Sequence, residues 1–119
     1  MGISKYDDLT NDAKFLLLEL SKKYQDAVLN HQDKREAVVM GSDQSIHDGI
    51  MPKWTLSDVK FMLGELDKAG FISVIYGNNQ YQCVELTTTA ISWREQKFGN
   101  DTKKIIKAIS DVKSLIPFF

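Results

Sequence analysis

The sequence predicts one α+β domain that is mainly helical, and three observations lead to that fold class. The chain has 119 residues, which is the length of one small domain. Hydrophobic residues make up 43% and charged residues 26%, close to the averages of globular chains, so wholesale disorder is excluded. Several segments show helical periodicity or helix-capping residues, and two apolar runs flank a glycine–asparagine turn. We therefore expect a single domain over residues 1–119.

The first predicted helix covers residues 11–28, where apolar side chains recur on one face at the 3.6-residue period. Thr10 or Asn11 is expected to cap its N-terminus. Phe15 and Leu18 lie off the apolar stripe, so the helix is apolar on two sides. We expect a central helix that more than one neighbour covers.

Residues 30–50 are harder to interpret. The apolar run from Ala37 to Met40 is short enough to be a strand or a helical turn, and periodicity does not choose between them. Ser42 or Asp43 is then expected to cap a short helix that stops before Pro52.

The clearest helix covers residues 55–69, with Thr55 as its cap and Gly70 as its stop. Two strands follow, at residues 71–76 and 80–86, and Gly77-Asn78-Asn79 between them tolerates the positive φ of a tight hairpin. The predicted core consists of Leu17, Leu20, Val59, Leu63, Leu66, Ile72 and Ile91.

Two helices are expected after the hairpin, one capped by Thr87 or Thr88 and one over residues 101–116. The last helix carries a narrow apolar stripe made of Ile105, Ile109, Val112 and Ile116. Two alternatives stay open for this isoleucine stripe. It docks on the first helix of its own chain, or it forms the seam of a homodimer that Phe118 and Phe119 would extend.

Two segments, and the order of all the elements, carry a resemblance to a known fold. Leu66–Ile72 is similar to the end of a third helix entering a first wing strand, and Glu85–Ala90 is similar to the step from a second wing strand through Leu-Thr into a helix. The chain thus resembles the winged helix-turn-helix superfamily over residues 9–98. The resemblance implies a three-helix core, with the hairpin as the wing and two additional C-terminal helices.

Three short segments, Gly70-Phe71-Ile72, Leu86-Thr87 and Lys103–Lys107, occur in the order of a narrower group. They look like the small YjcQ-like bacterial and phage family. That resemblance implies a winged-helix fold and no firmly assigned biochemical role.

The winged-helix resemblance implies that the third helix faces a DNA major groove. The outward positions of residues 55–69 include Ser57, Lys60 and Lys68, and Lys53 just before the cap would lie near a phosphate. Lys103 and Lys107 of the last helix contribute only if that helix flanks the same surface. These six residues are the nucleic-acid-binding candidates.

The charge of these segments disagrees with DNA binding. Residues 55–69 hold two lysines against three acids, and residues 71–86 hold no lysine or arginine. Because DNA affinity depends largely on neutralised phosphates, all five candidate lysines together give a salt slope of about −4 to −5 at most. We expect non-specific binding no tighter than about 10⁻⁵ M at physiological salt.

Phe61 lies almost opposite the buried stripe of the third helix, beside Gly64. Either it packs under residues 30–50 in a satellite core, or it is an exposed aromatic anchor of the kind that protein contacts use. Phe61, Phe118 and Phe119 are therefore the protein-contact candidates.

No catalytic set, metal site or cofactor site emerges, so an enzyme is not expected. His31 and His47 each lie near an aspartate, but metal ligation needs more ligands at regular spacing. The longest apolar run, Phe15 to Leu18, is far too short to span a bilayer. No signal-peptide pattern is present and the only cysteine is Cys83, so we expect a cytoplasmic protein.

Two functional hypotheses follow. The first is a small regulatory winged-helix module associated with DNA, similar to a transcriptional regulator. The alternative is a protein-interaction adaptor that uses the same fold without binding DNA.

Overall fold

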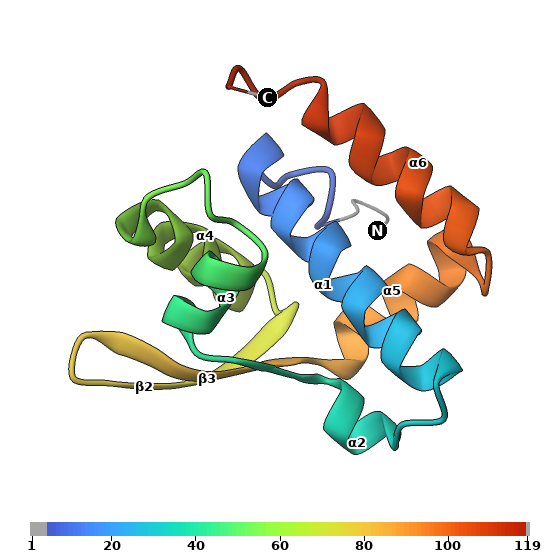
Figure 1. Cartoon of the computed structure of the whole chain (residues 1–119), viewed down its shortest axis with the longest axis horizontal. Coiled ribbons are helices and arrows are strands. Elements are labelled where there is room, and N and C mark those ends of the chain that lie inside the picture. The colour runs from blue at the N-terminus through green and yellow to red at the C-terminus, as the bar shows by residue number, and fades with distance from the viewer. Residues whose placement is uncertain (1–4, 119) are drawn as a thin grey trace.

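The computed structural model describes residues 5–118, and in them six helices and three strands form an α+β fold (Figure 1). In chain order these elements are α1 (Asn11–Leu29), α2 (Lys34–Ala37), β1 (Val39–Gly41), α3 (Asp43–Gly49), α4 (Leu56–Lys68), β2 (Ile72–Gly77), β3 (Gln80–Leu86), α5 (Thr88–Phe98) and α6 (Thr102–Lys113). Within residues 5–118, no helix is both long enough and apolar enough to cross a membrane.

Four helices are capped by residues that the sequence predicts, Thr10, Ser42, Thr55 and Thr87, whereas the cap of α2, Asp33, was not predicted. The side chains of Thr10, Ser42, Thr55, Thr87 and Asp101 each accept a hydrogen bond from a backbone N–H in the first turn of the helix that follows. Each cap satisfies a donor that would otherwise lack a partner at the helix start.

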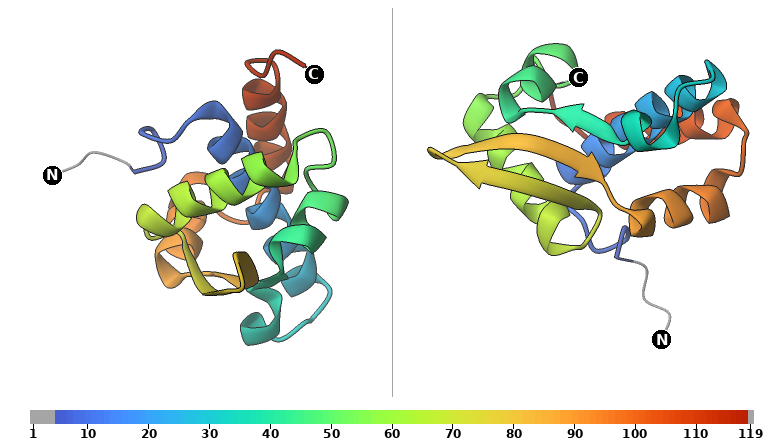
Figure 2. Two further views of the ribbon diagram at one scale, coloured as in Figure 1. Left: turned by 90° about the vertical axis from the view of Figure 1, so that its left-hand side faces the viewer. Right: turned by 90° about the horizontal axis from the view of Figure 1, so that it is seen from below.

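The strands form a small antiparallel sheet in the order β1-β3-β2. Strand β1 pairs with β3 through Val39 and Glu85, so the uncertain segment contains both a helical turn, α2, and a strand. Asn78 and Asn79 have φ of 54° and 60°, which confirms the predicted tight turn between β2 and β3. Figure 2 shows the tip of this hairpin at the opposite end of the molecule from α5 and α6.

Helix α1 is central, as predicted, because α2, α4, α5 and α6 all pack against it. Phe15 and Leu18 are both buried. The isoleucine stripe of α6 lies against α1, and Ile105, Val112 and Ile116 are buried there. In the structure the isoleucine stripe therefore docks on the first helix of its own chain.

Six of the seven predicted core residues are buried, and Ile91 is the exception because it is only half-buried. Helix α5 turns Ala90, Arg94 and Phe98 inward instead, which lie four residues apart on one face. Ile91 packs against the core from the edge of this face, and Arg94, which donates a hydrogen bond to Gln25 of α1, is buried in its place.

Candidate functional site

Helix α4 presents an outward surface between the start of α1 and the hairpin. Its inward face consists of Val59, Met62, Leu63 and Leu66, all of them buried. On the outward face Ser57, Phe61 and Lys68 are exposed, as predicted. Lys60 and Gly64 are only half-buried there, because the hairpin lies against this side of the helix.

Phe61 is 76% exposed and stands at the edge of a hollow of about 510 Å³. The hypothesis that Phe61 packs beneath residues 30–50 is wrong, because that segment forms β1 and α3, which pack elsewhere on β3 and α4. The lining of the hollow joins the start of α1, the middle of α4 and one side chain of β3: Thr10, Lys60, Phe61, Gly64, Glu65, Lys68 and Tyr81.

A β-bulge brings Tyr81 to this hollow. Ile75 pairs with Cys83, but the next residue of β2, Tyr76, pairs with Tyr81, so Gln82 is extra. Because side chains alternate along a strand, the extra residue moves Tyr81 to the face that looks at α4. Its ring packs edge-on against Tyr76 at 4.9 Å between centroids.

Tyr81 and Gly64 come very close to each other. A Cβ added at Gly64 would lie 3.1 Å from the Tyr81 hydroxyl oxygen. The glycine therefore leaves room for the tyrosine at the floor of the hollow. Gly64 is recognisable from its place on the outward face of the helix, whereas Tyr81 is not, because no residue type marks the bulge.

Lys60 is tied to the hairpin. Its Nζ donates a hydrogen bond to the carbonyl oxygen of Asn79 at 2.8 Å, and lies 3.9 Å from a carboxylate oxygen of Asp43. Asp43 is 2% exposed and also accepts the backbone N–H of Tyr81 at 2.9 Å. Lys60 thus compensates a buried carboxylate, which makes it less available to a phosphate than the sequence alone indicates.

The other charged side chains of α4 differ in whether they already have a partner. Both carboxylate oxygens of Glu65 are occupied by Thr10, at 2.7 Å from its backbone nitrogen and 2.9 Å from its hydroxyl. Asp58 and Asp67 are exposed. Lys68 is exposed and, within residues 5–118, pairs with no acid, so it is the cation of the hollow that a ligand can reach.

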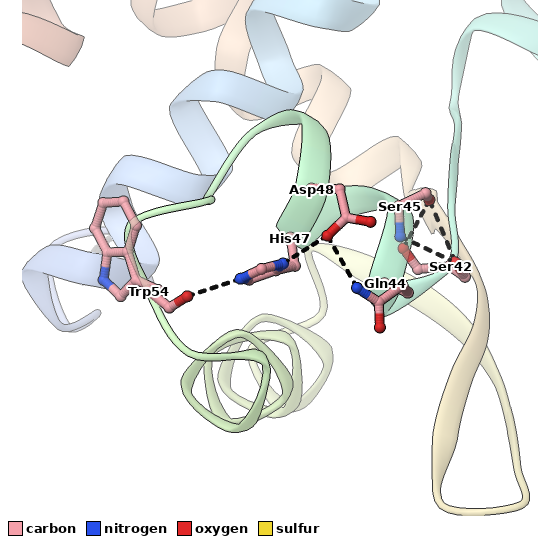
Figure 3. Close-up of polar contacts among 6 residues, drawn as sticks. All are labelled: Ser42, Gln44, Ser45, His47, Asp48 and Trp54. Carbon is pink, nitrogen blue, oxygen red and sulfur yellow. Dashed lines mark hydrogen bonds and ion pairs between the residues drawn. The ribbon is translucent and has the colours of Figure 1, made fainter.

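A polar clamp fixes the start of α4 (Figure 3). The His47 ring lies with Nδ1 2.8 Å from Asp48 and Nε2 2.8 Å from the carbonyl oxygen of Trp54, the residue before the α4 cap. Gln44 donates a further hydrogen bond to Asp48 at 2.9 Å. Since both neighbours of the imidazole are acceptors, the doubly protonated ring satisfies both contacts.

The charges of the clamp support each other. The hydrogen bond that the His47 ring donates to Asp48 raises the pKa of His47, and the same hydrogen bond lowers the pKa of Asp48. Across residues 5–118, no three histidine, cysteine or acidic side chains gather in a way that could hold a metal ion. Because the His47 ring contacts both Asp48 and the Trp54 carbonyl oxygen, we interpret the pair as a positioning element that joins the end of α3 to the start of α4.

The other predicted residues are spread over the molecule. Lys53 is exposed in the connection before α4. Lys103 and Lys107 are exposed on α6, whose N-terminal half lies with α5, away from α4 (Figure 1), and Lys107 pairs with Asp111 at 3.0 Å. The structure does not bring these two lysines to the surface of Lys60 and Lys68.

Of the two C-terminal aromatic residues predicted to contact a protein, the structure describes only Phe118. Phe118 is half exposed and packs edge-on against Trp54, with 4.9 Å between ring centroids. It therefore contacts its own chain beside the start of α4. Phe119 lies outside the described residues.

The chain matches no protein-family model, no curated protein and no solved structure in the comparisons made with each. The resemblances to winged-helix and YjcQ-like proteins therefore stay predictions made from the residues themselves.

Proposed function

We propose that this chain is a winged-helix regulatory module whose α4–hairpin surface binds a protein partner. The order of α1, β1, α3, α4, β2 and β3 supports the fold assignment. The pairing of β1 with β3 supports it further, because it places the first strand beside the hairpin that serves as the wing.

The observation that carries the choice of a protein partner is Phe61. A large aromatic side chain left 76% exposed at the edge of a hollow has the form of a binding anchor. Gly64 and the Tyr81 ring supply the floor, and Lys68 supplies a cation at the rim. The surface therefore suits a peptide segment with an apolar side chain for the hollow and an acidic residue for Lys68.

Duplex DNA is the second candidate, because α4 holds the position of a recognition helix in the proposed fold. Exposed Ser57 and Lys68 on α4, and Lys53 before it, favour this candidate. With Lys103 and Lys107 too distant, at most three of the five candidate lysines can reach phosphates, even with Lys60 included. At about 0.9 per neutralised phosphate, the salt slope is then no steeper than about −3.

The protein hypothesis is tested with peptides selected from a displayed random library on the immobilised chain. Binding is then measured by fluorescence anisotropy for the wild type and for Phe61→Ser. Loss of an anchor weakens binding about 30-fold or more. Ile75→Ser is the matched control, because Ile75 is also exposed but lies on the other face of the hairpin. Equal effects of the two substitutions, or no selected binders, would contradict the proposal.

The DNA hypothesis is tested with random duplex over a series of salt concentrations. We expect a dissociation constant no tighter than about 10⁻⁵ M at physiological salt. Lys68→Ala should weaken the binding, whereas Lys23→Ala on α1 should not. Nanomolar affinity with a steep salt slope would make DNA the partner instead of a protein.

A further inference from the structure

Arg94 is a buried cation without an acidic partner. It is 4% exposed, and within residues 5–118 its guanidinium forms no ion pair with a carboxylate. Nη2 donates hydrogen bonds to the side-chain oxygen of Gln25 at 2.6 Å and to the carbonyl oxygen of Gly99 at 3.3 Å. The buried Nε atom has no hydrogen-bond partner in this part of the chain. Because a buried charge is normally paired with an opposite charge, an anion bound beside this guanidinium would stabilise it.

Neutral groups hold the guanidinium in one place. The side-chain nitrogen of Gln25 donates to the Thr102 hydroxyl at 2.7 Å and to the Asn100 carbonyl oxygen at 3.4 Å, so its oxygen is fixed toward Arg94. The Tyr24 ring lies beside the guanidinium, 5.5 Å from its central carbon to the ring centroid. Arg94 is thus anchored between α1, α5 and the start of α6 while part of its donor capacity stays unused.

A small cavity of about 80 Å³ adjoins Arg94. At about 30 Å³ per water molecule, this volume holds two or three waters, or one tetrahedral oxyanion, and is too small for an aromatic ring or a nucleoside. Its lining contains two cations, Lys34 of α2 and Arg94, and one carboxylate, that of Glu95. The full lining is Tyr24, Gln25, Val28, Leu29, Lys34, Arg94, Glu95 and Asn100.

We propose that this cavity binds a tetrahedral oxyanion, phosphate or sulfate, through Arg94 with Lys34 as the second cation. The guanidinium has five N–H donors, of which Gln25 and Gly99 occupy two. Lys34 is exposed and adds a second positive charge to the lining of the cavity. Figure 1 shows α2 and the α5–α6 connection away from α4 and the hairpin tip, so this site does not depend on the proposed function.

The site is tested by titrating inorganic phosphate or sulfate into the full chain, with chloride reduced so that ionic strength stays constant. Two readouts are followed, the Nε–Hε NMR signal of Arg94 and the midpoint of thermal unfolding. We expect both to change and to saturate. A general salting effect of these anions stabilises the protein without saturation and without a shift specific to Arg94.

The variants separate binding from folding. Lys34→Ala changes an exposed residue and should weaken phosphate binding about tenfold, the effect of one charge-assisted contact. Arg35→Ala is the matched control, since Arg35 is the next residue of α2, carries the same charge and does not line the cavity. Arg94→Lys should abolish the saturable response to phosphate if the variant folds. If it does not fold, the comparison of Lys34→Ala with Arg35→Ala tests the site instead.

A further titration with methyl phosphate distinguishes the source of the anion. If it binds as inorganic phosphate does, the site takes the phosphoryl group of a larger molecule; if only the inorganic ions bind, the ligand is the free ion. A non-saturating response, or equal behaviour of Lys34→Ala and Arg35→Ala, would overturn the proposal.

Discussion

Replacing Gly64 with alanine is expected to stabilise the folded protein while it narrows the hollow beside Phe61. Glycine inside a helix lowers stability by about 0.5–1 kcal/mol relative to alanine. The added Cβ would meet the Tyr81 hydroxyl oxygen at 3.1 Å, closer than ordinary van der Waals contact, so the tyrosine must retreat by a few tenths of an ångström. Because that oxygen is at the far end of a half-buried side chain, the retreat is easy. The net gain in the free energy of unfolding should therefore lie below the full helix-propensity gain, between zero and about 0.5 kcal/mol.

The assay is urea unfolding followed by circular dichroism, together with the affinity for a selected peptide. Gly64→Ala should raise the unfolding midpoint and weaken peptide binding. Gly49→Ala is the control, because a Cβ at that position of α3 meets nothing within 4 Å; it should leave peptide binding unchanged.

A Tyr81→Phe background isolates the contact between the two side chains. Without the hydroxyl, Gly64→Ala should give the full helix-propensity gain, and the difference between the two backgrounds measures the coupling. If Gly64→Ala destabilises the protein equally in both backgrounds, Tyr81 does not limit this position and the described floor of the hollow is wrong.

The remaining predictions concern the core, pH and assembly. Leu63→Ala should lower the free energy of unfolding by about 2–5 kcal/mol, since Leu63 is fully buried, and a loss below about half a kcal/mol would mean that α4 turns another face inward. The raised pKa of His47 means that its stabilising contribution is complete below the ordinary histidine range and is lost as pH rises through the raised value. The lowered pKa of Asp48 means that its own contribution is lost as pH falls through the lowered value. The thermal midpoint should therefore fall from about pH 6 to 8 in the wild type and less in His47→Gln; equal curves would rule out the clamp. Finally, since the isoleucine stripe lies against α1, the chain should sediment as a monomer, and a dimer that dissociates when residues 115–119 are removed would contradict this packing.

Features that depend on neighbours in the sequence were predictable. Thr55 caps α4 by accepting a hydrogen bond from the backbone of Asp58, only three residues away. The two asparagines of the hairpin turn adopt positive φ for a reason that lies in their own side chains. Such contacts need no knowledge of where the rest of the chain lies, so residue type and spacing are sufficient to predict them.

Features that depend on distant segments were not predictable. Gln25 and Arg94 are 69 positions apart, and neither residue type by itself indicates a buried contact. The exposure of Phe61 depends on where residues 30–50 pack, and their short apolar run did not fix that. The position of Tyr81 depends on one extra residue in β3, Gln82. This residue shifts the alternation, so that Tyr81 lies on the opposite face of the sheet from the one that regular alternation would give it.

The packing of α6 along α1 has a consequence for synthesis on the ribosome. Thr102, at the start of α6, lies 77 positions after its partner Gln25 in α1. The first helix therefore leaves the exit tunnel long before the helix that covers it has been translated. Throughout that interval one apolar side of α1 faces solvent or a chaperone, and only the later arrival of α6 covers it. A chain released before α6 is translated would have its sheet complete but would leave the side of α1 that α6 covers exposed.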